Sequence, residues 1–594
     1  MKSMKRFWSI AREKHTRALI LMVIVVFNVL LWFLSSLLAY ALSPGHYGDV
    51  LSALWQSGIT WMLEPGFYDP TVDYAIRILS IVVILTSMIT FSGGIIGYVA
   101  SLFSSIIEEA ETGQSKLFIY DHILILNWNP KALELIVDYC FDDETTHIVV
   151  LSNHDKKEIE TEIAKKLYDL KGQKHQKIQV IVRQGDVLSK KDLSDNHIET
   201  AKTIIILDDE ENDVSHQNHQ DIFAIKSLML LNQFDIQPEQ TIIVEIKSPL
   251  SKHMIDTYIS KNMKLSNQLV TILPDELMGR LIAQTILMPA LNDVYAELFS
   301  FKGAEFYTIP KIDPLEFLQT RSKAIPIYAL DDQLFVLAES LEAVNQKRNE
   351  PLTGYPKITF KKGSRYKDRH LVVIGRNNKL SYILDSIQFY ERENNTKVYV
   401  TIIEEISVKD IFKALDQIDQ IDTILILSDD ALEAKDYDSD VLITLLLTQD
   451  IVAKHKAEVV IELLNPKHYD IAKCYNVTNT IISNEYISRI ITQLSKNRSL
   501  YPLYMDLLTY DAEDAQEETY EVYAYKASDI FEGPYPKQFT SAAELIYACY
   551  QSSNQEFVVI GLYQGTTKTI FKGDLDVKQN LVIEPNDTII AICK

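Results

Sequence analysis

Two long uncharged segments near the start of the chain limit its fold more than any other feature. Residues 18–42 form a run of 25 and residues 78–107 a run of 30, and neither run contains a charged side chain. A helix needs about 20 apolar residues to cross the hydrocarbon core of a bilayer. We therefore predict two transmembrane helices. A cleaved signal peptide is the alternative for the first run, which is longer than the roughly 7 to 15 apolar residues of such peptides.

Basic side chains predict how these helices are oriented. Six of them precede residue 18, whereas the connection over residues 43–77 contains only Arg77. Cytoplasmic flanks of transmembrane helices are enriched in lysine and arginine. We therefore expect the N-terminus in the cytoplasm, and two crossings return residues 108–594 to the same side.

The part of the chain after residue 107 is strongly acidic. The whole chain has a net charge of −23 although its N-terminal arm is basic. Such a surface repels nucleic acid and anionic lipid, which excludes nucleic-acid binding. The four cysteines, at positions 140, 474, 549 and 593, have no paired spacing, so neither a zinc site nor a disulfide framework is indicated.

The connection between the two uncharged segments has the pattern of a re-entrant pore loop. Residues 47–60 place apolar side chains at helical spacing, and Pro65 and Gly66 end any helix there. Non-helical backbone at membrane depth must be buried in protein or line a watery cavity, and acidic groups there mark ion paths. We predict a cation filter composed of Glu64, Pro65, Gly66, Phe67, Tyr68 and Asp69.

Glu64 is the residue expected to choose the ion. If four chains place this carboxylate about 6 Å apart around one axis, neighbouring pairs repel by roughly 3 kcal/mol at an effective dielectric of about 20. A divalent ion offsets that repulsion about twice as well as a monovalent one. This favours calcium permeation, and the potassium filter sequence TVGYG is absent. The alternative is that Glu64 braces the pore helix and never faces the ion.

Three glycines, Gly93, Gly94 and Gly97, interrupt the second uncharged segment. Glycine in such a helix serves either as a hinge or as a position where two helices pack closely. Both interpretations remain open, and the first would make these glycines the hinge of a gate.

Two sets of apolar, β-rich runs follow the membrane segments. The first set lies at residues 122–127, 147–152, 178–183, 203–207 and 241–246, and the second at 369–375, 397–405, 422–430 and 458–464. Strands that are apolar on both faces and alternate with helical stretches predict a parallel, doubly wound sheet. The matching segments DELMGRLIAQ at 275–284 and NEYISRIITQ at 484–493 indicate an internal duplication.

A doubly wound sheet suggests a dinucleotide enzyme, but the required turn is absent. The first turn of one lobe reads Asn127-Trp128-Asn129-Pro130 and that of the other reads Gly375-Arg376-Asn377-Asn378, in place of GxGxxG. We expect the side chain of Trp128 to fill the space that a phosphate would need. No nucleophile elbow, Walker sequence or HExxH motif is present either. An enzyme is therefore not expected.

Acidic clusters follow matching strands in the two lobes. The candidates for a calcium site are Asp208, Asp209, Glu210, Asp213, Asp429 and Asp430. Calcium takes six to eight oxygen ligands, which suits this density of carboxylates. The alternative, favoured for any single residue, is a solvated loop and the acidic first turn of a helix.

Several of these segments together resemble one family. LWQSGITWMLEPGFYDP, AETGQSKLFIYDHILILNWNPK and DELMGRLIAQTILMPALNDVYAELF are similar to segments of the CASTOR and POLLUX ion channels, which couple a pore to paired regulator-of-potassium-conductance (RCK) domains. The resemblance covers nearly the whole chain from about residue 45. It implies a homotetramer with a cytoplasmic gating ring and cation permeation. It also implies a role for calcium, either as the permeant ion or as a regulatory ligand.

Two departures from that family stand out. The plant members have four spans and a filter resembling ADAGNHA, whereas this chain has two spans and LEPGFYD. A two-span form without a transit sequence looks like a prokaryotic protein of the plasma membrane. Because the filter sequences differ, the resemblance says least about ion selectivity.

The resulting expectation is an α-helical two-transmembrane pore domain followed by tandem Rossmann-like RCK domains, each with a small α+β C-terminal subdomain. The expected parts are an arm at 1–17, a transmembrane helix at 18–42, a pore helix and filter at 43–77, a pore-lining helix at 78–107, a linker at 108–121, and RCK domains at 122–350 and 368–594. The function predicted is a ligand-gated cation channel. The alternatives are a membrane-anchored NAD-binding enzyme and a non-conducting regulatory subunit of a cation transporter.

Overall fold

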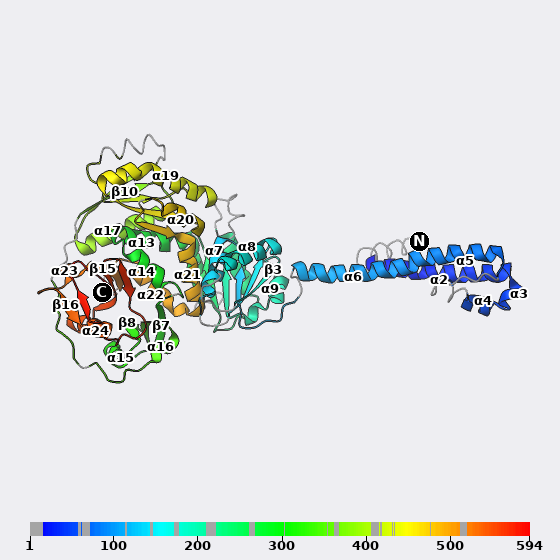
Figure 1. Cartoon of the computed structure of the whole chain (residues 1–594), viewed down its shortest axis with the longest axis horizontal. Helices are drawn as coiled ribbons and strands as arrows, with labels where there is room; N and C mark the ends of the chain where they lie inside the picture. Colours follow the sequence, from blue (N-terminus) through cyan, green and yellow to red (C-terminus); the bar gives the residue numbers. More distant parts are fainter. Residues whose placement is uncertain are drawn as a thin grey trace. The chain divides into compact units, whose positions relative to one another are not determined.

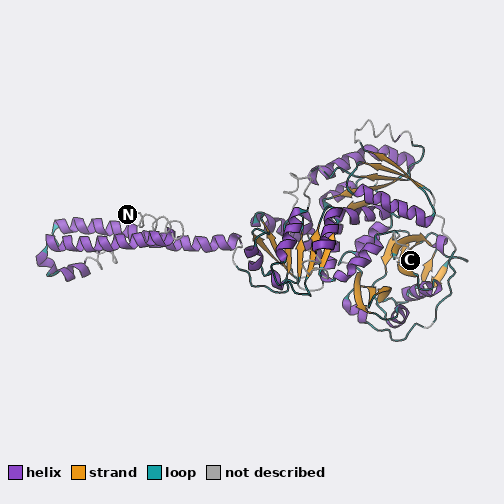
Figure 2. Ribbon diagram, turned by 180° about the vertical axis from the view of Figure 1, so that it is seen from behind, coloured by secondary structure: helices purple, strands orange, loops and turns teal. Residues whose placement is uncertain are grey.

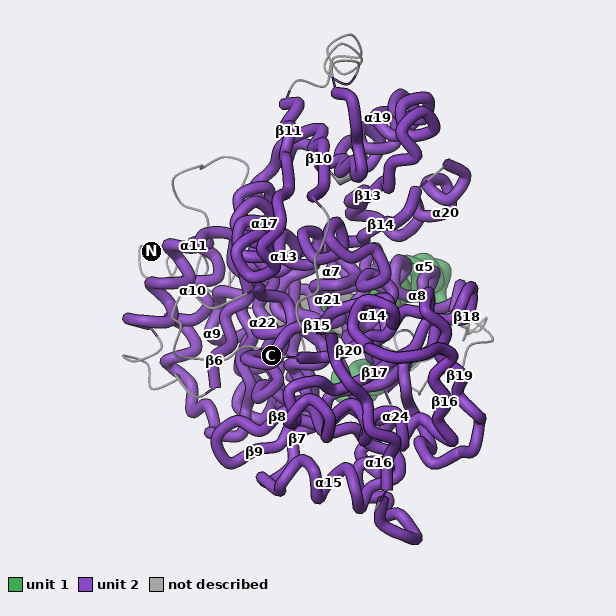
Figure 3. The backbone as a smooth tube through the Cα atoms, turned by 90° about the vertical axis from the view of Figure 1, so that its left-hand side faces the viewer, with its two compact units in different colours: residues 1–115 green, residues 116–594 purple. Residues whose placement is uncertain are grey.

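The computed structural model divides the chain into two compact units, Met1–Ser115 and Lys116–Lys594 (Figure 3). It describes residues 16–593 except 57–60, 62–71, 113–115, 143–145, 171–177, 209–220, 260–267, 302, 353, 362–367, 405–414, 416–417, 431, 433, 476 and 511–519.

The first unit is helical. Its elements are α2 (Thr16–Leu42), α3 (Pro44–Tyr47), α4 (Val50–Gln56), α5 (Tyr74–Ser87), the π-helix η2 (Met88–Ser92) and α6 (Gly93–Thr112). Two stretches, Met22–Leu42 and Tyr74–Ser104, are long and apolar enough to cross a membrane. Most of their large apolar side chains are exposed within the chain, as expected of helices that face lipid.

Polar side chains join the helices of this unit. The indole nitrogen of Trp32 in α2 donates to the carbonyl of Leu54 in α4 at 2.8 Å. The hydroxyl of Thr90 in the π-helix donates to Oδ1 of Asn28 in α2 at 3.0 Å. Because such groups have no water partners in an apolar setting, these bonds fix how α2 lies against α4 and against the second span.

The second unit begins with a six-stranded parallel sheet (Figure 2). Its order is β3 (Gln179–Gln184), β2 (His147–Ser152), β1 (Ile123–Leu126), β4 (Thr203–Ile206), β5 (Thr241–Glu245) and β6 (Leu269–Ile272). The helices of this first lobe are α7 (Pro130–Tyr139), α8 (Lys156–Asp169), α9 (Lys190–Asp195), η3 (Ile198–Thr200), α10 (Ile222–Leu231), α11 (Pro249–Met254) and η5 (Ile255–Ile259). The order reverses between β1 and β4, which is the Rossmann pattern expected from the sequence.

A second lobe repeats this plan with five parallel strands. Its order is β11 (Val398–Ile403), β10 (Arg369–Ile374), β12 (Thr423–Ile426), β13 (Glu458–Leu463) and β14 (Asn479–Ile482). Its helices include α17 (Lys379–Asn394), α19 (Ala434–His455), η6 (Pro466–His468) and α20 (Tyr469–Ala472) (Figure 1). The sequence did not predict β6 or β14, which are four residues long and directly precede the matched helical segments.

Smaller antiparallel sheets follow each lobe. After α13 (Pro274–Leu287) and α14 (Leu291–Leu298) come β7 (Glu305–Pro310), α15 (Pro314–Thr320), β8 (Ala324–Leu330), β9 (Gln333–Ala338) and α16 (Leu341–Asn345). After α21 (Ser483–Lys496), η7 (Arg498–Leu500) and α22 (Tyr501–Leu507) come β15 (Glu521–Lys526), α23 (Ala527–Ile530), β16 (Lys537–Phe539), α24 (Ala542–Ser552), β17 (Phe557–Gln564), β18 (Thr567–Ile570), β19 (Leu581–Ile583) and β20 (Thr588–Cys593).

Each lobe sends one helix onto the other. Helix α13 of the first lobe packs along α17 of the second, and α21 of the second packs along α7 of the first (Figure 1). A single apolar core runs through both lobes and both small subdomains. The two lobes therefore form one body, and the repeated fold relates one lobe to the other.

Small residues allow the two helix crossings. A Cβ added at Gly279 in α13 would lie 2.7 Å from Cβ of Tyr382 and 2.9 Å from the carbonyl oxygen of Lys379 in α17. At the matching position of α21, the hydroxyl of Ser488 donates to the carbonyl of Lys131 in α7 at 2.9 Å. Real Cβ contacts are longer than 3.0 Å, so the α13–α17 crossing requires glycine.

We predict that Gly279→Val lowers the free energy of unfolding by about 1–3 kcal/mol, because the added side chain overpacks the crossing. Gly354→Val is the matched control, since a Cβ at Gly354 has no atom within 4 Å. Thermal unfolding of the full chain in detergent measures both. Equal midpoints for the two variants would contradict the close approach of α13 to α17.

Candidate functional site

The predicted filter, Glu64, Pro65, Gly66, Phe67, Tyr68 and Asp69, lies outside the described residues. Its flanks are held by the second span. The hydroxyl of Ser87 in α5 donates to the carbonyl of Trp61 at 3.2 Å. Nε of Arg77 donates to the carbonyl of Val72 at 2.8 Å. The ends of the loop are thus tied to α5 on both sides of the predicted filter.

The three glycines of the second span do not share one environment. A Cβ at Gly94 would approach the side chain of Ile24 in α2 to 2.8 Å, whereas one at Gly97 would have no atom within 4 Å. Gly94 is therefore a close-packing position. The π-helix η2 ends directly before Gly93, and π-helical turns within α-helices occur often at functional sites. The role of Gly93, Gly94 and Gly97 as a gate hinge stays a prediction.

In the first βα turn of lobe one, a side chain of the protein occupies the backbone donors that could otherwise bind an anion. Oδ1 of Asn129 accepts hydrogen bonds from the backbone N–H groups of Lys131 and Ala132 at 3.0 and 3.2 Å. These are the donors that a phosphate uses at a helix N-terminus. The side chain of Trp128 instead donates from its indole nitrogen to Glu162 on α8 at 3.2 Å. Asn129 is therefore an obstacle to a dinucleotide, and the expectation that Trp128 fills the phosphate space stays a prediction.

The matching turn of lobe two is closed in the same way. Gly375 has φ of +89°, and a Cβ there would lie 2.0 Å from the carbonyl oxygen of Leu427, so only glycine fits. Oδ1 of Asn377 accepts from the N–H of Lys379 at 3.2 Å. A carboxylate oxygen of Asp430 accepts from the N–H of Asn378 at 2.7 Å. A side-chain carboxylate thus stands where a bound phosphate would.

Only half of the six calcium candidates lie within the described residues. Asp209, Glu210 and Asp213 lie outside the described residues. Asp208 is buried and pairs with Nζ of Lys247 at 2.5 Å. Asp429 is exposed, and Asp430 pairs with Lys379. Among the residues with a described structure, no group of three or more acidic, histidine or cysteine side chains is arranged to hold a metal. The calcium site stays a prediction.

Lys379 is the centre of a buried charge cluster that the sequence did not predict. Its Nζ lies 3.4 Å from Asp275, 3.4 Å from Asp430 and 3.5 Å from Glu462. Tyr437 donates its hydroxyl to Glu462 at 2.6 Å. Burial opposes the charge on Lys379, but the three carboxylates outweigh burial and raise the pKa of this ammonium group.

This Lys379 cluster joins the two lobes. Asp275 is in the first turn of α13 from lobe one, whereas Lys379, Asp430 and Glu462 belong to lobe two. Burial raises the pKa of Asp430, while Lys379 lowers it. The ammonium group of Lys379 compensates the negative charge of the surrounding carboxylates. It therefore fastens α13 to α17 on this side of the repeat.

The opposite side of the repeat lacks this cluster, although a different charge pair, Lys496 of α21 with Asp142 beyond the end of α7, joins the lobes there. Lys131 occupies the position of Lys379 and pairs with Glu245 at 2.9 Å. The residue in the position of Asp275 is Asn484, whose amide donates to the carbonyl of Leu464 at 3.1 Å. A carboxylate from the neighbouring lobe is thus replaced by an amide that turns back to its own lobe.

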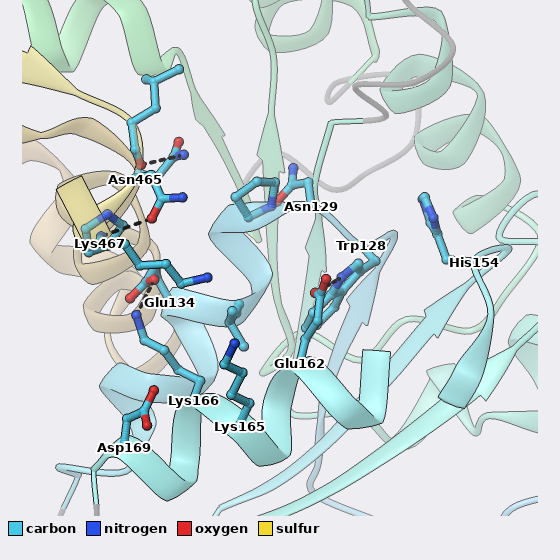
Figure 4. Close-up of a pocket in the computed structure, with 15 residues that line it drawn as sticks. Trp128, Asn129, Glu134, His154, Glu162, Lys165, Lys166, Asp169, Asn465 and Lys467 are labelled. Atoms are coloured by element: carbon cyan, nitrogen blue, oxygen red, sulfur yellow. Dashed lines mark hydrogen bonds and ion pairs between the residues drawn. The ribbon is translucent and has the colours of Figure 1, made fainter. Parts of the chain in front are cut away.

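A cleft of about 590 Å³ lies beside Asn484. Trp128, Lys165 and Lys166 line it from lobe one, and Asn465 and Lys467 line it from lobe two (Figure 4). Lys166 pairs with Glu134 at 2.8 Å across its wall. No sequence motif predicts the cleft, because the cleft forms only where the two lobes meet.

We predict that Lys379→Met lowers the free energy of unfolding by about 3–5 kcal/mol, because three carboxylates lose their buried cation. Arg376→Gln, which breaks an exposed pair with Glu404, is the control and should cost about 0.2–1 kcal/mol. Chemical denaturation of the full chain measures both changes. The double variant Lys379→Met with Glu462→Gln should recover part of the loss. Equal costs for Lys379→Met and Arg376→Gln would contradict the cluster.

Comparison with known proteins agrees with this architecture. A model of the calcium-activated potassium channel slowpoke-like RCK domain matches residues 132–280, within lobe one. The probable ion channel POLLUX of Arabidopsis thaliana is 23% identical, over 86% of this chain and 70% of the relative. The probable ion channel CASTOR of Oryza sativa subsp. japonica is 22% identical, over 86% of this chain and 64% of the relative. Ion channel CASTOR of Lotus japonicus is 21% identical, over 86% and 67%.

Solved structures include the GsuK channel bound to NAD, which is 12% identical and covers 98% of this chain and 97% of its own, with a TM-score of 0.41. The chain spans 64 to 70% of the length of the three named plant relatives. The resemblance seen in the sequence is confirmed by these relatives. The chain is thus similar to the CASTOR and POLLUX ion channels over most of its length, and residues 132–280 match an RCK domain.

Proposed function

We propose that this protein is a homotetrameric, ligand-gated cation channel whose pore is opened or closed by a cytoplasmic ring of RCK lobes. One observation carries the proposal. Two apolar helices, joined through a short helix and a loop, precede an RCK lobe in a chain that is similar to named ion channels over 86% of its length. In this proposal the protein lies in the plasma membrane with both termini in the cytoplasm.

In this proposal residues 43–77 form the pore helix and filter and residues 78–107 line the pore. Glu64 to Asp69 select the ion, and calcium either permeates or regulates the channel. The π-helix η2 and Gly93, Gly94 and Gly97 form the hinge of the gate. Support comes from the ties of Trp61 and Val72 to α5, which make the position of the loop depend on the second span.

Exposed apolar side chains support the assembly of several copies. Met229 on α10 and Met254 on α11 are exposed in lobe one, and Leu446 on α19 and Ile471 on α20 are exposed at the matching positions of lobe two. Apolar groups repeated on one face of both lobes indicate a surface that another protein covers. Four chains would contribute eight lobes to one ring.

The interlobe cleft is the place we assign to ligand control. A ligand that contacts Lys165 and Lys467 would bridge the lobes at the side where Asn484 replaces a carboxylate. Binding moves a two-state equilibrium only by its difference in affinity between the two states, usually about 1–3 kcal/mol per site. Four identical sites would multiply this effect on one gate.

An NAD-dependent enzyme is disfavoured by the turns of both lobes. Asn129 occupies the phosphate donors of α7, and Asp430 occupies one of those of α17. A dinucleotide would have to displace an amide from one helix and a carboxylate from the other. A lobe that only transmits movement within a ring binds no dinucleotide, so these side chains do not have to be displaced.

We predict that the purified full chain in liposomes carries a cation flux, and that Glu64→Gln reduces the permeation or block by divalent ions. The physical reason is the loss of a ring of charge at the filter. Asp73→Asn, which removes an exposed carboxylate outside the filter, is the matched control. Unchanged divalent behaviour in Glu64→Gln would remove Glu64 from the pore wall, and a lack of flux would overturn the channel.

We also predict a mass of four chains in mild detergent, reduced in Leu446→Glu because a charge would enter the proposed contact between copies. Val577→Glu, at an exposed apolar residue outside that surface, should leave the mass unchanged. Light scattering coupled to size exclusion measures the three proteins. A stable monomer for the unaltered chain would exclude the proposal.

A further inference from the structure

The segment that enters lobe one is bound to the surface of that lobe. In this docking segment, residues 116–121, the N–H of Leu117 donates to the carbonyl of Asp195 at 2.9 Å, and that of Asp121 to the carbonyl of Thr200 at 3.0 Å. Leu117 and Ile119 pack against an apolar core of the lobe. These contacts hold the last residues before β1 against α9 and η3.

His122 follows the docking segment and is enclosed by the lobe. Its side chain has 0% exposure, and within the described part of the chain neither ring nitrogen has a hydrogen bond of good geometry, although the backbone of Asn196 lies near enough to favour the charged ring. Unpartnered polar atoms also occur beside it, at Oδ1 of Asn196 and Nε2 of His197. A buried imidazole without a partner is costly, and it becomes far more costly when it carries a charge.

Histidines from two other elements face this group. His147 at the start of β2 and His197 between α9 and η3 both act on His122 electrostatically. The ring of His197 lies 5.7 Å from that of Phe118 and 5.6 Å from that of Tyr120, both in the docking segment. The segment and the histidines therefore form one contact region.

Burial lowers the pKa of His122 to about 4. The backbone of Asn196 and the carboxylate of Asp121 favour the charged form, while His197 and His147 disfavour it further. His122 is therefore neutral in the docked state at neutral pH. It gains a proton at moderately acidic pH only when the surrounding contacts open.

We propose that residues 116–122 form a proton-sensitive dock, which releases the chain leading from α6 when the surrounding solution becomes acidic. His122 is the group that takes up the proton, and in this proposal its exposure accompanies loss of the hydrogen bonds from Leu117 to Asp195, from Asp121 to Thr200 and from Lys202 to the carbonyl of His122. Its effect on a gate rests on the proposed channel function, because the same segment is the covalent link between the second span and lobe one.

The sign follows from proton linkage. Stability rises with pH wherever the open state binds more protons than the docked state. The open state has the ordinary histidine pKa of 6.5 and the docked state a value of about 4, so docking weakens as pH falls below about 6.5. Between pH 7.5 and 5.5 the docking equilibrium should fall by about tenfold.

Hydrogen exchange of the full chain in detergent tests the dock. The peptide over residues 116–126 is followed at pH 7.5 and 5.5, and its rates are divided by the intrinsic exchange rate at each pH. We expect its protection to fall about tenfold at pH 5.5. The variant His122→Phe should keep the protection nearly constant, and His122→Asn serves the same purpose if the phenylalanine variant does not fold.

His370 provides a matched control, since it holds the position of His122 in lobe two and stacks on Tyr399 with ring centroids 4.8 Å apart. His370→Phe should respond to pH as the unaltered protein does. Constant protection in the unaltered chain, or an equal fall in His122→Phe, would overturn the dock. Ion flux is measured separately, so a pH-dependent dock without flux would keep the dock and overturn the channel.

Discussion

The exchange of helices between the two lobes is the constraint on which the rest of the cytoplasmic unit depends. Since α13 packs on α17 and α21 packs on α7, the lobes share one apolar core and cannot separate as independent domains. Close approach at Gly279 and a hydrogen bond at Ser488 fix the two crossings. A body packed in this way is expected to switch between discrete arrangements of its lobes rather than to deform continuously.

The contact of α13 with α17 and the matching contact of α21 with α7 differ, so the two sides of this body are not equivalent. Lys379 binds a carboxylate from the other lobe, and the matching position beside Lys131 holds Asn484. The Lys379 side has three carboxylates around one ammonium group, whereas the other side is joined by the single pair Lys496–Asp142 and borders the cleft. In our account a ligand at the cleft adds a contact where Asn484 replaces a carboxylate, and the docking segment carries the resulting movement toward the second span.

The sequence predicted the parts of the molecule whose signals are local. Uncharged runs predicted the two apolar helices, and doubly apolar runs predicted nine of the parallel strands. Strands β6 and β14 were missed because polar residues, Thr271 in one and Asn479 and Thr480 in the other, interrupt their apolar runs. The self-capping of the βα turns by Asn129 and Asn377 follows from side-chain geometry that a motif search does not contain. The cleft and the Lys379 cluster join residues that are far apart in the chain, so no spacing could reveal them.

The central claim is that four copies surround one axis with residues 62–71 facing it. Electron cryomicroscopy of the full chain in lipid nanodiscs tests this claim most directly. The account predicts four chains, a central path lined by the second span, and Glu64 at its narrow part. A map in which that loop faces lipid, or in which the copies enclose no path, would contradict the account.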